Sequence, residues 1–157
     1  MAIEIEHKFL LANNAWRLHI DHSVSYRQGY LSTAPTSSMR VRTSDTQAWL
    51  NIKSATIGTQ RHEFEYEIPL SDANTLLHEL CTKPLIEKVR HCVYAHGKLW
   101  EIDEFSGANA GLLVAEIELN YLDEIFIKPD WVGEEVTYDP RYYNNNLATL
   151  PYSEWAR

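Results

Sequence analysis

Basic residues, cysteines and long apolar runs are all scarce in this sequence of 157 residues. Lysine and arginine number 14 against 22 aspartates and glutamates, so the formal net charge is −8. A protein without an overall positive field is a poor general partner for nucleic acid or for an anionic membrane surface. We therefore predict no nucleic-acid partner and no membrane partner, and any anionic ligand needs a local basic site.

The missing hydrophobic and cysteine patterns exclude further classes of protein. No run of about 18 apolar residues occurs, and no signal-peptide pattern follows Met1, so we expect a cytoplasmic protein. Cys81 and Cys92 are too few for a disulfide framework and too far apart for a zinc knuckle, and we expect two buried thiols. The absence of a G-x-x-x-x-G-K motif excludes a P-loop nucleotide site.

Short stretches of alternating polar and apolar residues, separated by turn signals, fill most of the sequence. Its length and its hydrophobic content of 45% suffice for one domain with a substantial core, so we predict a single domain over residues 1–157. Strands are expected at residues 2–11, 24–31, 39–43, 47–54, 61–68, 86–95, 98–104 and 113–121. Leucines at helical spacing predict a helix over 72–81, and the sequence from Pro129 onward predicts a cap rather than another long strand. The five tryptophans are interpreted as core or cap packing.

Charged residues take alternate positions of these predicted strands and are sorted by sign. The like-charged pairs are Glu4/Glu6, Glu101/Asp103, Glu116/Glu118, Arg40/Arg42 and Lys88/Arg90. Two architectures fit this pattern: an antiparallel sheet with its charged face in water, or a closed barrel with the charges inside and helices covering an apolar outside. The sorting favours the barrel, because solvated strands more often mix signs.

A barrel with such an interior would bring two kinds of binding group together. Clustered carboxylates repel one another unless a cation joins them, and hard divalent ions take carboxylate oxygens readily. Clustered arginines and lysines suit a chain of phosphates. One cavity with both linings would hold a metal ion and a polyphosphate side by side.

The segment Glu4-Ile5-Glu6-His7-Lys8 matches the E-x-E-x-K signature of the CYTH superfamily, the triphosphate tunnel metalloenzymes. The resemblance continues through RQGYL at 27–31, MRVR at 39–42, RHEFE at 61–65, EKVR at 87–90, WEIDEF at 100–105, VAEIEL at 114–119 and GEEVTYDPRYYNNNLA at 133–148. The chain looks most like the short bacterial members that hydrolyse inorganic triphosphate. The resemblance implies a mainly β (α+β) fold, a closed eight-stranded antiparallel β-barrel forming a tunnel with a charged interior and flanked by a few helices.

The same resemblance implies the site and its reaction. Metal, Mg²⁺ or Mn²⁺, would be held by Glu4, Glu6, Glu63, Glu65, Asp103, Glu116 and Glu118. Phosphates would be bound by Lys8, Arg40, Arg42, Lys53, Arg61, Lys88 and Arg90. Glu6, Glu118 and Lys88 all remain open as the general base. Arg141 and Tyr142 belong to a segment that resembles the helix plugging one tunnel end in relatives.

The expected activity is metal-dependent hydrolysis of inorganic triphosphate to diphosphate and phosphate, with a small-molecule triphosphate as partner and a monomer or homodimer as the assembly. Within the family the alternatives are a class IV-type adenylate cyclase and a thiamine or nucleoside triphosphatase. Outside the enzymes, the alternative is a polyphosphate-binding module without turnover. Because the proposed ligand positions all keep charged side chains, the enzyme reading is preferred.

Overall fold

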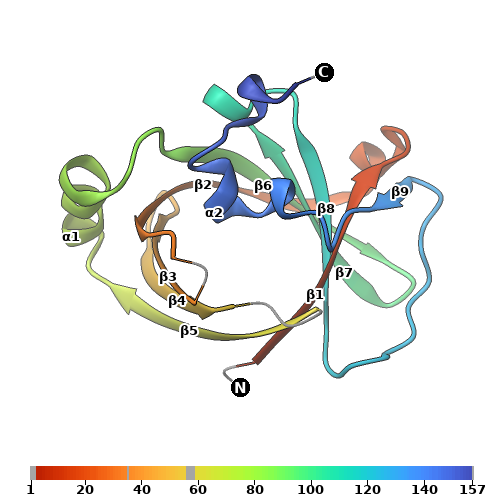
Figure 1. Ribbon diagram of the computed structural model, residues 1–157. Helices are drawn as coiled ribbons and strands as arrows, with labels where there is room; N and C mark the ends of the chain where they lie inside the picture. The colour runs from red at the N-terminus through yellow and green to blue at the C-terminus, as the bar shows by residue number, and fades with distance from the viewer. Residues whose placement is uncertain (1–2, 35, 56–58, 157) are drawn as a thin grey trace.

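A computed structural model describes residues 3–34, 36–55 and 59–156, and in these ranges nine strands form one sheet (Figure 1). The sheet order is β5-β4-β3-β2-β6-β7-β8-β1-β9, and a further pairing of β5 with β1 closes eight of the strands into a ring. Their bounds are β1 Ile3–Leu11, β2 Ile20–Ser32, β3 Ser37–Thr43, β4 Ala48–Ser54, β5 Gln60–Ile68, β6 Ile86–Ala95, β7 Lys98–Phe105, β8 Leu113–Leu119 and β9 Val132–Glu135. Every pairing is antiparallel. The predicted closed barrel of eight antiparallel strands is therefore confirmed.

The helical segments are short and lie outside the ring or over one end of it (Figure 1). Their bounds are η1 Ala15–His19, α1 Leu70–Thr75, η2 Leu76–Leu80, η3 Gly107–Asn109, η4 Pro140–Tyr142, α2 Asn144–Leu147 and η5 Tyr152–Glu154. The helix expected over 72–81 begins earlier, at Leu70, and its second half is the π-helical turn η2. None of the helices within the described ranges is long and apolar enough to cross a membrane.

The strand β1 closes the ring and also holds the C-terminal segment. One edge of β1 pairs with β8, from Ile5 to Phe9. The other edge pairs first with β5, at Ile3 to Ile5, and then with β9, at Phe9 and Leu11. The expectation of no further long strand after Pro129 agrees with β9, which has four residues, although the sequence analysis did not predict this strand.

Among the described residues, two hydrophobic clusters lie outside the ring, against the apolar faces of the strands. Trp16 of η1 belongs to the same cluster as Phe9, Trp100 and Ile102. Helix α1 covers β3 and β4, and η2 lies against β2. A third cluster, with Ile86, Phe105 and Val114, lies on the inner face and packs against Leu147 of α2. Burying the apolar outer face leaves the charged residues of the same strands on the inner face. Cys81 and Cys92 are free and buried in this structure, as predicted.

One tryptophan does not follow the packing interpretation. Trp16, Trp100 and Trp131 are buried in the core, and Trp155 packs against Tyr142 and Tyr152 of the C-terminal segment. Trp49 instead alternates with the inward-facing Asn51 and Lys53 of β4, is half-buried, and lies against Arg42. The sequence analysis assigned Trp49 to the core because it is a large aromatic residue. Its position on the charged face of β4 places it beside the tunnel instead.

Candidate functional site

The inner face of the ring encloses a cavity of about 230 Å³ whose lining is almost wholly charged. Its lining residues are Glu4, Glu6, Lys8, Arg40, Arg42, Lys53, Arg61, Glu63, Glu65, Arg90, Glu101, Glu116, Glu118 and Asn144. All the predicted site residues are among them except Lys88 and Asp103. They meet because alternate residues of six strands, β1, β3, β4, β5, β6 and β8, point to the same side of the sheet.

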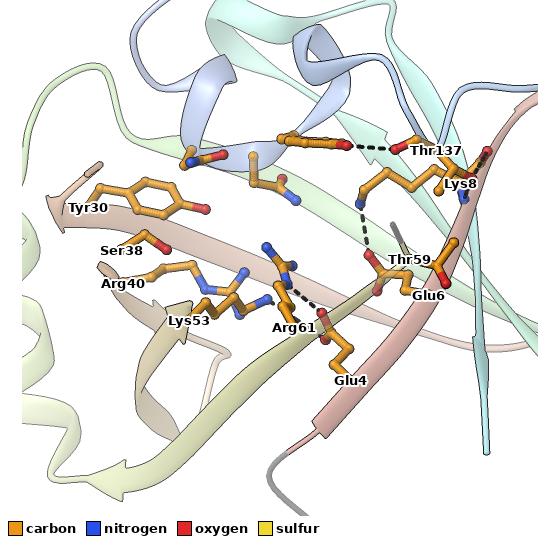
Figure 2. A pocket seen from close by; sticks show the side chains of 13 residues that line it. Glu4, Glu6, Lys8, Tyr30, Ser38, Arg40, Lys53, Thr59, Arg61 and Thr137 are labelled. Atoms are coloured by element: carbon orange, nitrogen blue, oxygen red, sulfur yellow. Dashed lines mark hydrogen bonds and ion pairs between the residues drawn. The ribbon is translucent and has the colours of Figure 1, made fainter. Parts of the chain in front are cut away.

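A second compartment, of about 30 Å³, lies on the side of α2 and shares several walls with the main cavity. Its additional lining consists of neutral polar groups from Tyr30, Ser38, Thr59, Thr137, Tyr143 and Asn145. Figure 2 shows Tyr30 and Arg40 on the side of this compartment opposite Lys8. A volume of this size holds about one water molecule, so the C-terminal segment closes this side of the tunnel to larger groups.

Backbone hydrogen bonds fix the closing segment to β1 at the level of Lys8. The Lys8 N–H donates to Thr137 Oγ1 over 2.9 Å, and the Val136 N–H donates to the Lys8 carbonyl over 2.8 Å. The Tyr143 hydroxyl then donates to the Thr137 carbonyl over 2.7 Å. Lys8 therefore has a fixed backbone position between the tunnel and its closed end.

On the wall formed by β1 and β8, one ammonium group lies between two carboxylates. The register places Glu6 opposite Glu118 and Lys8 opposite Glu116. Lys8 Nζ lies 2.7 Å from Glu116 Oε1 and 3.0 Å from Glu6 Oε1. Burial and the neighbouring Glu116 raise the pKa of Glu6 to about 8. This wall therefore has more carboxyl groups than Lys8 can pair with as anions.

The wall formed by β1, β4 and β5 contains a second set of ion pairs. Arg61 Nε donates to Glu4 Oε1 over 2.8 Å, and Lys53 Nζ lies 2.9 Å from Glu63 Oε2. Burial opposes ionisation of Glu4, but Lys53 and Arg61 together lower its pKa to about 2. Burial, together with Arg40, lowers the pKa of Lys53 to about 8.

Arg40 differs from the other cations of the tunnel. Arg40 is 5% exposed and lines both compartments, yet no carboxylate of the described residues forms an ion pair with it. Its Nε is buried and has no hydrogen-bond partner among the described residues. A buried guanidinium without a carboxylate is costly unless an anion binds it, so Arg40 is a candidate residue for binding an anion.

Lys88 and Asp103 lie behind the cavity wall rather than on its surface. Both side chains are fully buried, and Lys88 Nζ donates to Asp103 Oδ2 over 2.8 Å. Asp103 also accepts two hydrogen bonds from Arg90, from Nε over 2.8 Å and from Nη2 over 3.0 Å. Burial disfavours ionisation of Asp103, but Arg90 and Lys88 outweigh it and lower the pKa of Asp103. For Lys88, burial lowers the pKa to about 7. This pair therefore supports Arg90, which reaches the cavity.

The carboxylates of the tunnel suit a hard divalent ion, although they are not gathered around one point. Within the described ranges, no three histidine, cysteine or carboxylate ligands already form a metal cluster. Glu118 lines the cavity without an ion pair in the described part of the chain, and burial with Glu4 and Glu63 raises its pKa to about 6. An excess of carboxylate oxygens with raised pKa values is the donor set that Mg²⁺ or Mn²⁺ would stabilise, so the residues present fit such an ion.

The sequence analysis missed several residues around the cavity. Glu101 lines it, and its alternation with Asp103 was the signal that could have assigned it to the site. Trp49 shares the inner face of β4 with Lys53, and Tyr26 stands opposite Lys88 of β6 in the strand register. Both rings contact Arg42. Asn144 and Thr137 carry no sequence signal of their own, because only the folded C-terminal segment brings them to the tunnel.

The fold and the site together define a closed antiparallel barrel whose charged tunnel suits a small polyanion and a divalent cation. The sequence model of the CYTH domain matches residues 2–146, and the chain belongs to this family. It is 46% identical to an inorganic triphosphatase of Acetivibrio thermocellus over 155 residues, 99% of each protein. It is 38% identical to an inorganic triphosphatase of Nitrosomonas europaea, over 92% of this chain and 96% of that protein.

Solved structures agree with this assignment. A structure of an inorganic triphosphatase has a TM-score of 0.66 and 34% sequence identity, covering 92% of this chain and 97% of that one. A Hippeastrum protein described as a putative adenylyl cyclase with a dominant triphosphatase activity has a TM-score of 0.53 at 16% identity and supports the fold alone. The resemblance to the CYTH superfamily stated from the sequence is therefore confirmed.

Proposed function

We propose that this protein hydrolyses inorganic triphosphate to diphosphate and phosphate, with Mg²⁺ or Mn²⁺ as its cofactor. The observation that carries the proposal is Arg40, a buried guanidinium that faces a charged cavity and lacks a carboxylate partner among the described residues. The two relatives named inorganic triphosphatase, which cover nearly the whole chain, support the same substrate.

The basic residues bind the phosphate chain in this proposal. Those that reach the cavity are Lys8, Arg40, Arg42, Lys53, Arg61 and Arg90. A triphosphate repels an attacking water by its own charge, so fixed cations that neutralise it provide most of the catalysis by positioning and electrostatic stabilisation. Lys88 does not reach the cavity surface, and its role is to hold Asp103 and through it Arg90.

The carboxylates of β1 and β8 hold the metal in this proposal. Glu4, Glu6, Glu116 and Glu118 would be its ligands, and Glu63 and Glu65 stand at the same cavity as further ligands or as groups that orient water. A bound divalent ion supplies positive charge for the phosphates and lowers the pKa of water. Asp103 is not a metal ligand in this proposal, because it binds Lys88 and Arg90 behind the cavity wall.

The three residues left open as general base have different surroundings. Lys88 is fully buried behind Asp103, and Glu6 contacts Lys8 at 3.0 Å. Glu118 faces the cavity, is partly exposed, and forms no ion pair with the described residues. Of the three residues, Glu118 is therefore the one with an unpaired carboxylate at the cavity in the described ranges, and we assign it to hold the metal that lowers the pKa of the attacking water.

Substrate choice follows from the closed end of the tunnel. The compartment beneath α2 has about 30 Å³, which leaves no room for a purine or a thiazole on that side. An inorganic chain of phosphates fills the charged cavity without needing such room. The closed end therefore excludes the organic group of ATP or thiamine triphosphate on that side, and the two inorganic triphosphatase relatives support the choice of inorganic triphosphate.

The test is turnover of tripolyphosphate, ATP and thiamine triphosphate, each with Mg²⁺, with Mn²⁺ and with a chelator. We expect the largest kcat/KM for tripolyphosphate, and no turnover in chelator. Preference for ATP or thiamine triphosphate, formation of cyclic AMP, or binding of tripolyphosphate without hydrolysis would each overturn the proposal.

A further inference from the structure

Two aromatic side chains interrupt the charged inner face, and both contact the same guanidinium. Trp49 of β4 stands directly opposite Arg42 of β3 in the strand register. Tyr26 of β2 reaches Arg42 from the other side, and the two ring centroids are 6.4 Å apart at an interplanar angle of 66°. Arg42 Cζ lies 4.5 Å from the centroid of Tyr26 and 5.2 Å from that of Trp49. Both distances are those of cation–π contacts.

The polar contacts of Arg42 are few. Its Nη2 reaches Glu65 Oε2 only at 3.4 Å, and its buried Nε has no hydrogen-bond partner among the described residues. Burial, together with Arg40 and Arg90, lowers the pKa of Arg42 to about 10. This guanidinium therefore lies near two other arginines and has only one weak contact with a carboxylate.

The other tunnel arginines provide a contrast within the same molecule. Arg61 donates to Glu4 over 2.8 Å, and Arg90 binds Asp103 through two donors. A carboxylate that holds an arginine in this way also accepts the N–H groups that a phosphate needs. The face of an aromatic ring attracts the cation but has no oxygen atom to accept hydrogen bonds from its N–H groups.

We propose that Tyr26 and Trp49 are positioning residues that hold Arg42 by cation–π contacts rather than by a close carboxylate, so that its N–H donors can bind the phosphate chain. The inference rests on the proposed function, because it supposes that Arg42 binds a phosphate. Tyr26 has a second neighbour of the same kind, since Arg90 Cζ lies 5.9 Å from its centroid. The Tyr26 ring is thus within cation–π reach of two guanidiniums.

The test is a double-mutant cycle on tripolyphosphate hydrolysis, with kcat and KM measured separately. Tyr26→Leu removes the ring and is expected to raise KM about 5- to 30-fold, the scale of a cation–π contact in a partly desolvated site. Tyr26→Phe keeps the ring face and should stay within about twofold of the parent. In an Arg42→Ala background, Tyr26→Leu should cost less than about twofold, because its partner is gone.

Two controls keep the result interpretable. Tyr66→Leu removes an outward-facing strand tyrosine that is 56% exposed, and it should leave KM unchanged. Trp49→Leu, compared with Trp49→Phe, repeats the cycle with the second ring in case Tyr26→Leu does not fold. Circular dichroism reports folding for every variant.

Each outcome decides something different. If the parent neither binds nor hydrolyses tripolyphosphate, the proposed function fails. If the parent turns it over while Tyr26→Leu and Trp49→Leu keep the parent KM, the positioning role is wrong. The positioning role is equally wrong if the effects of Tyr26→Leu and Arg42→Ala multiply, because that result describes two independent structural losses.

Discussion

Within the described part of the chain, most charges of the tunnel are paired with an opposite charge, and two are not. Lys8, Lys53, Arg61 and Arg90 each contact at least one carboxylate within 3.0 Å. Arg40 and Glu118 have no such partner in the described ranges. Arg40 is buried, so the lack of a partner indicates the place of an anion there. Glu118 is more exposed, and its free carboxylate is open to a metal ion.

Replacement of Arg40 tests the anion site directly. Arg40→Ala removes charge-assisted hydrogen bonds of about 1.5–3 kcal/mol each, so we expect kcat/KM for tripolyphosphate to fall about 10- to 100-fold or more. Arg17→Ala is the matched control, because Arg17 pairs with Glu104 outside the tunnel. Parent-like kinetics in a folded Arg40→Ala variant would remove this residue from the site.

The pKa of Glu6 gives a prediction about stability. Burial and Glu116 raise the pKa of Glu6 to about 8, so the folded protein favours the protonated form of this residue. The stabilisation is complete below the ordinary pKa near 4.5 and is lost as the pH rises through about 8. Metal-free Glu6→Gln, which cannot ionise, should therefore melt above the parent at pH 8–9. The difference should shrink toward pH 5, and a difference that does not vary with pH would contradict the assigned pKa.

At the scale of elements, β1 links the tunnel to the segment that closes it. The link depends on Thr137, whose Oγ1 accepts from the Lys8 N–H and contacts Glu135 Oε2 at 2.5 Å. Because the Lys8 N–H is buried, losing this acceptor leaves it unsatisfied.

Thr137→Val tests that link with a nearly isosteric side chain. We expect a loss of about 1–3 kcal/mol in the free energy of unfolding, the cost of one buried unsatisfied donor. Thr137→Ser keeps the hydroxyl and should recover most of the loss. Urea denaturation measures both, and equal stability of the Val and Ser variants would show that the hydrogen bond does not hold the closing segment.

Alternation along the strands predicted the ring and the face on which most of the site lies. It did not predict β9, because four residues show too little alternation and their partner on β1 is more than 120 residues away in sequence. The start of β2 at Ile20 was missed for a similar reason, since its first residues are mostly polar and gain their pairing from β6. Whether such short segments form strands depends on pairing with distant parts of the chain, which the local sequence pattern does not show.

The same limit applies to the site residues. Alternation gives the face of a side chain and says nothing about its depth, so Lys88 and Asp103 were expected in contact with ligand and instead lie beneath Arg90. Tyr26 and Trp49 were passed over because aromatic residues on strands are usually core residues. Only the neighbouring guanidinium distinguishes their role.

For the whole molecule, a net charge of −8 coexists with a cavity that holds six cationic side chains. The acidic exterior repels large polyanions, while the tunnel accepts a small one. Membership of the CYTH family agrees with this arrangement.

Ligand binding to such a cavity should stabilise the folded protein. Tripolyphosphate with Mg²⁺ at about 100 times its dissociation constant should add about 2.7 kcal/mol, because the unfolded chain lacks the site. Thermal unfolding should show a melting temperature several degrees higher than without ligand, and diphosphate at equal concentration should shift it less. No shift at saturating tripolyphosphate and Mg²⁺ would count against the tunnel as a binding site.

The central claim is that one cavity binds metal through its carboxylates and phosphate through its cations. Steady-state hydrolysis of tripolyphosphate over a Mg²⁺ titration, with Glu118→Gln and Arg40→Ala compared side by side, tests this division most directly. We expect Glu118→Gln to lose about 10- to 100-fold at limiting metal and to regain part of that loss in excess metal, because it lacks one anionic ligand. Arg40→Ala should stay impaired at every metal concentration. Two folded variants that keep parent activity at limiting metal, or that fail alike without any response to metal, would contradict the account.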